Sequence, residues 1–174
     1  MDQAYIIFGV PRSLHGRLIN QRKGKPDFFM PDAITIELSY AGGLLINIHA
    51  SALSVEARPP RFWIRGTKGS FHKQGLDPQE GQLLAGAQVA DAEFGHESLD
   101  RYKLTGLAKD GSVLEGEMPE LKPETYLAFY EAWGKAVASG QPDLVPVKAS
   151  ESRDVLRVIE AVVESSKTGM DVVS

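Results

Sequence analysis

The sequence contains no cysteine, no long apolar run and no dominant charge, and each absence narrows what the protein can do. Without cysteine there are no disulfides, thiolate metal ligands or cysteine nucleophiles. No window reaches the ~18 apolar residues of a membrane span, and the N-terminus lacks the basic and apolar regions of a signal peptide. Lys and Arg are scattered and the net charge is −4, which disfavours nucleic-acid binding. We therefore expect a cytoplasmic protein with neither a membrane nor a nucleic-acid partner.

Motifs for nucleotide, phosphate and metal binding are missing as well. No Gly-x-Gly-x-x-Gly follows a strand pattern, no Walker loop or His-Glu-x-x-His is present, and the four histidines are not spaced as metal ligands. The segment 66–70, Gly-Thr-Lys-Gly-Ser, has the residue types of a phosphate loop. Because no helix pattern follows it, we interpret it as a turn at a strand end. We expect no catalytic residue, bound cofactor or metal in this chain.

What the sequence does contain is the composition of a globular protein. Of its 174 residues, 43% are hydrophobic and 24% are charged. This is the size of one ordinary domain, and a chain of this length buries roughly two-thirds of its unfolded surface. We therefore predict a single domain over residues 1–174.

Alternating hydrophobicity predicts that strands dominate the first two-thirds of the chain. Residues 33–40 and 44–53 alternate on either side of the turn Ala41-Gly42-Gly43, which indicates an antiparallel hairpin with one apolar and one polar face. Further strands are predicted at 13–22, 61–66, 101–107 and 113–118, the last two as a second hairpin around 109–111. The segment 24–32 is predicted to be a loop, and 69–94 a long loop excursion.

Helical periodicity predicts a short helix at 2–8 and two longer helices after residue 122. The first long helix, with Pro123 in its first turn, has an aromatic stripe that we interpret as core: Tyr126, Phe129, Tyr130, Trp133 and Val137. The last helix, with Ser150 as N-cap, has an apolar stripe at Val155, Val158, Ile159, Val162 and Val163 and ends at Gly169; a short strand at 171–173 follows.

Strands followed by helices predict an α+β fold. We expect an open, mainly antiparallel (mixed) sheet with helices packed on one face. The other face, polar along the 33–53 hairpin, is open to water, a substrate, a second domain or a second subunit.

Several short segments, taken in order, resemble a known family. They are Asp2-Gln3-Ala4, Phe8-Gly9 with Pro11, Gln21-Arg22, His49-Ala50-Ser51, Arg61-Phe62, Gly66-Thr67-Lys68-Gly69-Ser70-Phe71, Lys73, Gly75-Leu76-Asp77-Pro78-Gln79-Glu80, Tyr126, Phe129-Tyr130, Pro146-Val147, Ser165-Ser166 and Gly169. This order resembles the C-terminal domain of the glucose–fructose oxidoreductase / inositol dehydrogenase (Gfo/Idh/MocA) family, over essentially the whole chain.

The resemblance implies a parent protein with two domains. Family members carry an N-terminal Rossmann domain that binds NAD or NADP, and a second domain whose open sheet face shapes the substrate site and mediates subunit contacts. Their substrates are sugars, polyols or derivatives, and an upstream Lys and an Asp/His pair assist proton transfer. In the family an Asp-x-Gly-x-His signature closely precedes the Asp-Gln of positions 2 and 3, whereas here Met1 directly precedes Asp2. No family catalytic residue is therefore carried onto this sequence.

Two functional hypotheses follow. The first is that the chain is the substrate-binding and dimerisation domain of an NAD(P)-dependent oxidoreductase, inactive without its Rossmann domain. The alternative is a stand-alone module that dimerises through its sheet, with Trp63 and Arg65 beside the polar hairpin face. If a complete enzyme exists, we expect its small-molecule substrate to contact polar residues at strand ends and in the long loop: Arg22, His49, Lys73, Asp77 and Gln79. The competing interpretations are a solvated or interface histidine at His49, a turn at 77–79 and a solvated charge at Lys73.

Overall fold

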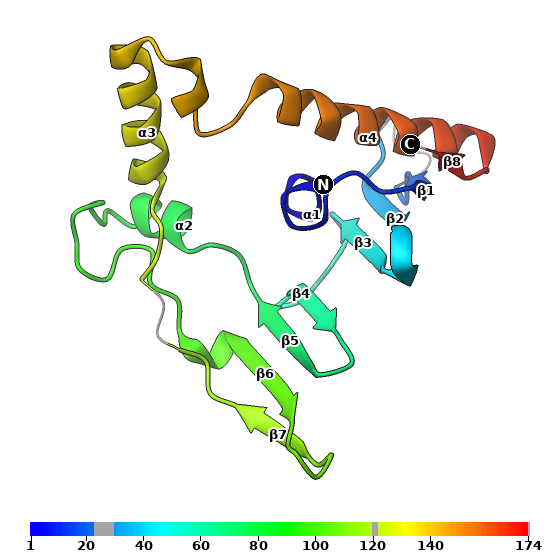
Figure 1. The fold of residues 1–174 in the computed structure, drawn as a ribbon, viewed down its shortest axis with the longest axis horizontal. Helices are drawn as coiled ribbons and strands as arrows, with labels where there is room; N and C mark the ends of the chain where they lie inside the picture. Colours follow the sequence, from blue (N-terminus) through cyan, green and yellow to red (C-terminus); the bar gives the residue numbers. More distant parts are fainter. Residues whose placement is uncertain (23–29, 120–121, 174) are drawn as a thin grey trace. The chain divides into compact units, whose positions relative to one another are not determined.

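A computed structural model describes residues 1–22, 30–119 and 122–173 (Figure 1). The chain forms two compact units, Met1–Val55 with Val147–Ser174 and Glu56–Pro146, which subdivide the region predicted as one domain. Both units combine antiparallel strands with helices, so the α+β prediction is confirmed. The strands form two four-stranded sheets, one in each unit.

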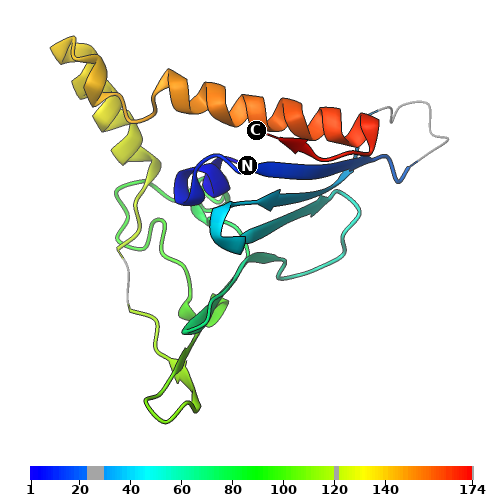
Figure 2. The same cartoon turned by 45° about the vertical axis from the view of Figure 1, so that its right-hand side comes forward.

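The first unit packs two helices against a sheet of order β3-β2-β1-β8. Its elements are α1 (Asp2–Phe8), β1 (Ser13–Ile19), β2 (Ala33–Ser39), the 3-10 turn η1 (Ala41–Gly43), β3 (Leu45–Ser51), α4 (Ala149–Thr168) and β8 (Val172–Val173). The β2–β3 pair joined by η1 is the hairpin that alternation predicted. Figure 2 shows α4 lying along this sheet.

The core of the first unit forms where α4 crosses the apolar sheet face. Leu14, Ile36 and Leu38 from the strands pack with Val158 and Val162 of α4, and all five are buried. Burial of such side chains contributes roughly 1.5–3 kcal/mol each. The alternation assigned Ile36 and Leu38 to a buried face and the helical stripe did so for Val158 and Val162, whereas for Leu14 only a strand was predicted.

A glycine lets the helix approach the sheet closely. A Cβ at Gly16 in β1 would lie 2.8 Å from Cγ1 and 2.9 Å from the carbonyl oxygen of Val162. The backbone N–H of Gly16 donates to Ser165 Oγ at 3.0 Å, and that hydroxyl donates to the Met170 carbonyl at 2.6 Å. The Ser165 hydroxyl therefore links β1 to the C-terminal end of α4 without leaving a buried polar group unpaired.

The second unit contains a sheet of order β4-β5-β6-β7, antiparallel throughout. Its elements are β4 (Pro60–Arg65), β5 (Gly69–Gln74), α2 (Gln79–Leu84), η2 (Leu99–Arg101), β6 (Tyr102–Leu107), β7 (Val113–Gly116), α3 (Tyr126–Ser139) and η3 (Pro142–Leu144). The β6–β7 hairpin was predicted. Residues 66–68 form the turn between β4 and β5, closed by a 2.8 Å bond from the Gly66 N–H to the Gly69 carbonyl, so the interpretation of the segment 66–70 as a strand-end turn is confirmed.

The predicted loop excursion over 69–94 is wrong. It contains strand β5 and helix α2. The β5 sequence, Gly-Ser-Phe-His-Lys-Gln, does not alternate between apolar and polar residues. It is a strand because β4 and β6 hydrogen-bond to both of its edges, and such tertiary pairing overrides weak local preference.

Several boundaries also differ from the prediction. The first strand ends at Ile19 rather than at Arg22, because the Asn20 carboxamide accepts the Arg22 N–H at 3.0 Å in a local turn. The helix expected from Pro123 begins at Tyr126. The last helix begins before Ser150, and its Glu151 carboxylate accepts the Lys148 N–H at 3.0 Å. Residues 24–29 of the loop predicted over 24–32 lie outside the described part of the chain.

The aromatic stripe of α3 is not core, contrary to the prediction. Tyr126, Phe129, Tyr130, Trp133 and Val137 are all exposed. Periodicity shows that an apolar face exists, but it does not show what covers that face. Among the described residues, no helix is long and apolar enough to cross a membrane.

Candidate functional site

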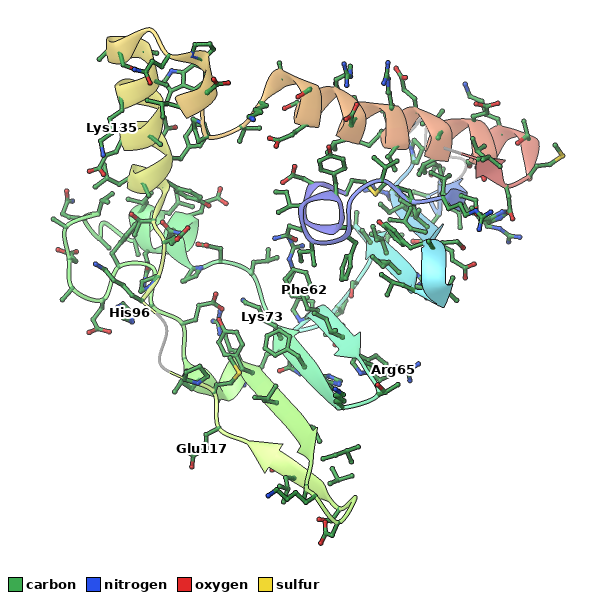
Figure 3. The ribbon with its side chains drawn as sticks, in the orientation of Figure 1. Phe62, Arg65, Lys73, His96, Glu117 and Lys135 are labelled. Carbon is green, nitrogen blue, oxygen red and sulfur yellow. The ribbon has the colours of Figure 1, made fainter. Side chains whose placement is uncertain are left out.

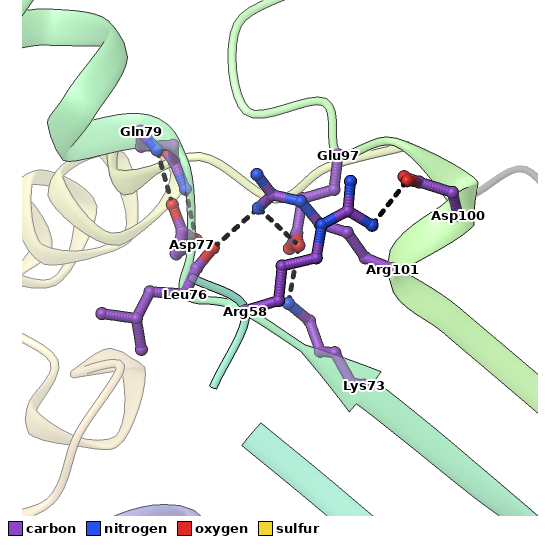
Figure 4. A network of polar contacts seen from close by, with 8 residues as sticks. All are labelled: Arg58, Lys73, Leu76, Asp77, Gln79, Glu97, Asp100 and Arg101. Carbon is purple, nitrogen blue, oxygen red and sulfur yellow. Dashed lines mark hydrogen bonds and ion pairs between the residues drawn. The ribbon is translucent and has the colours of Figure 1, made fainter. Parts of the chain in front are cut away.

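An ion pair between β5 and the segment before η2 forms the centre of a polar network in the second unit (Figure 4). Lys73 Nζ lies 2.6 Å from Glu97 Oε2, and both side chains are only 14% exposed. The Lys73 ammonium also lies 5.2 Å from the centroid of the Tyr102 ring, which pairs with Lys73 across β5 and β6. A charge-assisted bond shielded from water in this way is stronger than one at the surface.

Arg101 extends the network to the loop after β5. Its Nη1 lies 3.8 Å from Glu97 Oε2 and donates to the Leu76 carbonyl at 3.3 Å. The guanidinium lies against Gly75, whose φ of +74° suits glycine and where a Cβ would be 3.2 Å from Nη1. Glu97 is therefore the carboxylate that joins β5, η2 and this loop.

The same carboxylate changes the ionisation of the neighbouring tyrosine. Burial raises the pKa of the Tyr102 hydroxyl above its ordinary value of 10.0, and the negative charge and hydrogen bond of Glu97 raise it further. Tyr102 is thus neutral at physiological pH, with its hydroxyl bonded to Glu97. At the outer side of the network, Arg58 lies 2.8 Å from Asp100, whose pKa is lowered by hydrogen bonds from Ser98 and Arg58.

The Asp77–Gln79 turn connects this network to α3. The Asp77 carboxylate accepts the Gln79 backbone N–H at 2.8 Å and the Gln79 side-chain amide at 3.0 Å. The same amide donates to the Glu124 carbonyl at 3.3 Å, and its oxygen accepts the Tyr126 N–H, the first of α3, at 3.0 Å. Gln79 is 2% exposed, and its buried side chain caps α3 from a distant part of the chain.

The network balances its charges and therefore suits a neutral polar ligand. The cations of Arg58, Lys73 and Arg101 are matched by the anions of Asp77, Glu97 and Asp100. Lysine and arginine offer several N–H donors each, and carboxylates offer acceptors. Vicinal hydroxyl groups, which both donate and accept, match such a surface without a net charge to neutralise.

Arg22 lies in the first unit, at the edge of its sheet. Its Nε lies 2.8 Å from Asp32 Oδ2, and the other oxygen of Asp32 accepts the Gln21 N–H at 2.7 Å. These bonds, the Gln21 N–H first and the Arg22 side chain next, lower the pKa of Asp32 below its ordinary 3.8. Gln21 also accepts the Ser51 hydroxyl at 3.0 Å, so this group joins the ends of β1 and β3.

His49 lies on the polar outer face of the same sheet. It is exposed on β3, opposite Thr35, which in turn lies opposite Arg17 on β1. The face assignment made from alternation is correct, because Ile46 and Ile48 point to the core side.

A shallow groove with a volume of about 430 Å³ lies on one face of the second sheet. Trp63 is largely exposed there, with the Arg65 guanidinium 5.0 Å and the His72 ring 5.0 Å from its ring centroid. Phe62 and Lys73, which pair across β4 and β5 and are labelled in Figure 3, occupy the opposite face. The sheet thus has two distinct surfaces, one bearing the Trp63 groove and one bearing Lys73.

The structure unites three of the five residues proposed as substrate contacts. Lys73, Asp77 and Gln79 share the network of the second unit, whereas Arg22 and His49 belong to the first unit. Their role as substrate contacts stays a prediction. Sequence reasoning missed Glu97 and Arg101, because tertiary contacts determine their partners and neither spacing nor periodicity indicates them. In the described ranges, no group of three or more His, Asp or Glu side chains could hold a metal ion.

Comparisons with known proteins agree with this architecture. The family model "Oxidoreductase family, C-terminal alpha/beta domain" matches residues 1–174. The scyllo-inositol 2-dehydrogenase (NADP(+)) IolW of Bacillus subtilis is 32% identical over 168 residues, which are 96% of this chain and 44% of that protein. The uncharacterized oxidoreductase YdgJ of Escherichia coli is 33% identical over 169 residues, or 96% of this chain and 45% of that protein.

A solved structure gives the same result. That of yvaA from Bacillus subtilis superposes with a TM-score of 0.87 at 29% identity, over 99% of this chain and 48% of that one. The chain spans less than half the length of each of these three relatives.

Proposed function

We propose a function for this chain, which belongs to the Gfo/Idh/MocA oxidoreductase family through its C-terminal alpha/beta domain. It is the substrate-binding and dimerisation half of an NAD(P)-dependent oxidoreductase of the cytoplasm. Its substrate is a sugar, a polyol or a related compound. The observation that carries this proposal is the shielded Lys73–Glu97 pair within a charge-balanced network. The name of IolW, a dehydrogenase of an inositol that uses NADP⁺, supports both the substrate class and the cofactor.

In this proposal the chain positions the substrate. Glu97 fixes the Lys73 ammonium with one bond, which leaves further N–H donors for substrate hydroxyls. Asp77 is held by two bonds from Gln79 and presents a preorganised acceptor. Holding a substrate in one orientation lowers the barrier to its reaction, because its translational and rotational freedom is lost on binding rather than on reaching the transition state.

The glycine-rich segment 66–70 does not fit the phosphates of a nicotinamide nucleotide. It leads into strand β5, so it lacks the helix N-terminus at which glycine-rich turns hold phosphates. NAD or NADP supplies hydride transfer when bound, and we assign its binding to the Rossmann domain that the family resemblance implies. This chain alone is then inactive.

Titration of the purified chain with NADPH tests this assignment, with energy transfer from Trp63 and Trp133 to the nicotinamide as the signal. We expect no saturable binding by the chain alone. We also expect NADPH binding by a fusion protein, the joined protein, in which the nucleotide-binding half of IolW is linked to the N-terminus of this chain at Met1. Saturable binding, or oxidation of any sugar, by the chain alone would contradict the proposal.

The dimerisation role rests on the Trp63 groove. An exposed tryptophan flanked by Arg65 and His72 on an open sheet face has the composition of an interface centre. The alternative function, a stand-alone dimerising module, uses the same face. Light scattering on the wild type and on Trp63→Lys measures the oligomeric state of each. We expect the wild type to be a dimer and the substitution to dissociate it. A wild type that stays monomeric at high concentration would refute dimerisation.

A further inference from the structure

We infer that the carboxylate of Glu97 makes the polar network around Lys73, the Lys73 network of Figure 4, selective for neutral sugars and polyols over sugar acids. This inference rests on the proposed function, because it takes the Lys73 network to be the substrate site. Glu97 is then a specificity-determining residue that acts through the cations it neutralises.

One carboxylate neutralises both inner cations of the network. Glu97 Oε2 lies 2.6 Å from Lys73 Nζ and 3.8 Å from Arg101 Nη1, and Figure 4 shows the carboxylate joined to both. The side chains of Lys73 and Glu97 are largely buried. Partly buried charges are screened much less than exposed ones, so the charge balance at this point acts strongly on a ligand beside Lys73.

Two neighbouring groups contribute less negative charge than their positions suggest. The pKa of the Tyr102 hydroxyl is raised by burial and then by the charge and hydrogen bond of Glu97, so the hydroxyl is neutral. Asp77 is an exposed carboxylate that already accepts two bonds from Gln79. Water screens its charge more than it screens that of Glu97.

The remaining pair of the network neutralises itself. Arg58 and Asp100 lie 2.8 Å apart at the outer side, and both side chains are exposed. The inner balance therefore depends on Glu97, which sets its one charge against those of Lys73 and Arg101.

A change in this balance has a different effect on neutral and on anionic ligands. Glu97→Gln keeps the size of the side chain and removes one negative charge, so the charges of Lys73 and Arg101 then exceed that of Asp77. A unit charge about 5 Å from another changes a binding equilibrium on the order of 100-fold at an effective dielectric constant of about 20. In the wild type the Glu97 carboxylate repels a sugar carboxylate that approaches Lys73 and competes with it for the ammonium group.

Competition kinetics of the joined protein with a matched pair of ligands test the inference. Glucose and glucuronate share one ring and differ in the carboxylate that replaces a CH2OH group, and each is used as an inhibitor of scyllo-inositol oxidation by NADP⁺. We expect Glu97→Gln to raise the inhibition constant of glucose divided by that of glucuronate at least tenfold. If Glu97 only held Lys73 in place, both ligands would weaken by the same factor and this ratio would not change.

Two further variants test whether the effect depends on charge at this position. Glu115→Gln makes the same change in net charge at the exposed Lys103–Glu115 pair, outside the network, and should leave the ratio within twofold of wild type. Arg101→Gln removes an inner cation and should lower the ratio, which tests the sign independently if Glu97→Gln does not fold. An unchanged ratio in Glu97→Gln, an equal rise in Glu115→Gln, or a ratio that does not fall in Arg101→Gln would overturn the inference.

The proposed function fails on a different result. Equal KM values for scyllo-inositol in Lys73→Met and Lys68→Met would show that the network does not bind the substrate. A raised KM in Lys73→Met together with an unchanged ratio in Glu97→Gln would refute the role of Glu97 alone.

Discussion

At the scale of single residues, the Lys73–Glu97 pair determines how firmly the polar network of the second unit is held. Glu97→Gln removes the charge that Lys73, Arg101 and Tyr102 share, in a place where both paired side chains are 14% exposed. We expect the free energy of unfolding to fall by about 1.5–3 kcal/mol, the range for hydrogen bonds to charged groups.

The matched control is Glu115→Gln, which breaks the Lys103–Glu115 pair, whose side chains are 60% and 76% exposed. Such a surface pair contributes below about 1 kcal/mol. Urea denaturation followed by circular dichroism measures both. Equal losses in the two variants would show that the Lys73–Glu97 pair is no more shielded than a surface pair.

A second residue-scale prediction concerns acid. The folded-state pKa of Asp32 lies below its ordinary 3.8 because Gln21 and Arg22 donate to the carboxylate. A carboxyl whose pKa is lowered in the folded state stabilises the fold at pH values above its ordinary pKa. For Asp32 this contribution is lost as the pH falls from 3.8 through the folded-state pKa. Asp32→Asn should therefore be less stable than wild type at pH 7, and the difference should shrink below pH 3.8. Stability curves that stay parallel throughout this range would refute the assignment.

At the scale of elements, Gln79 determines where α3 begins. Gln79→Ala removes the acceptor of the Tyr126 N–H and the donor to the Glu124 carbonyl. We expect a loss of about 1–2 kcal/mol, similar to that of an N-cap, together with faster hydrogen exchange at the start of α3. Gln74→Ala, at an exposed glutamine in β5, is the control and should change neither quantity. Equal exchange rates at 126–128 in wild type and Gln79→Ala would contradict the capping role.

The packing of α4 on β1 gives a further prediction. Gly16→Ala places a methyl group 2.8 Å from a side-chain atom and 2.9 Å from the carbonyl oxygen of Val162. Overpacking of this kind costs about 1–3 kcal/mol. The matched strand variant Gly106→Ala meets nothing within 4 Å and should stay within about 0.5 kcal/mol of wild type. Thermal unfolding checks both, and a Gly16→Ala protein as stable as Gly106→Ala would show that the helix shifts freely.

The sequence predicts elements well where their own side chains carry the signal. The alternation of Ile34, Ile36 and Leu38 identified both the β2–β3 hairpin and its buried face. Strand β5 was missed because its position depends on its neighbours rather than on its own pattern. The start of α3 was misplaced because its cap, Gln79, is 47 residues away in the chain.

The candidate site shows the same difference between what local patterns predict and what tertiary contacts determine. Lys73, Asp77 and Gln79 were selected as polar residues of a resembling motif, and the structure brings them into one network. Their partners Glu97 and Arg101 are determined by tertiary contacts that no local pattern records. For Gln79, burial shows a role in supporting α3 that its residue type alone did not indicate.

At the scale of the whole molecule, we propose that the chain binds and orients a substrate and depends on another half for chemistry. Its charge-balanced network, the exposed aromatic stripe of α3 and the Trp63 groove are three separate surfaces of the second unit. We propose that the network binds a polyol or a sugar and that the Trp63 groove meets a second subunit.

The central claim is that the Lys73 network binds the substrate. Steady-state kinetics of the joined protein with NADP⁺ and scyllo-inositol, the substrate that the name of IolW indicates, test it most directly. Lys73→Met should raise the KM for the polyol at least tenfold and leave the KM for NADP⁺ within twofold, whereas Lys68→Met, in the exposed turn before β5, should change neither. A polyol KM for Lys73→Met equal to that of Lys68→Met would contradict the account.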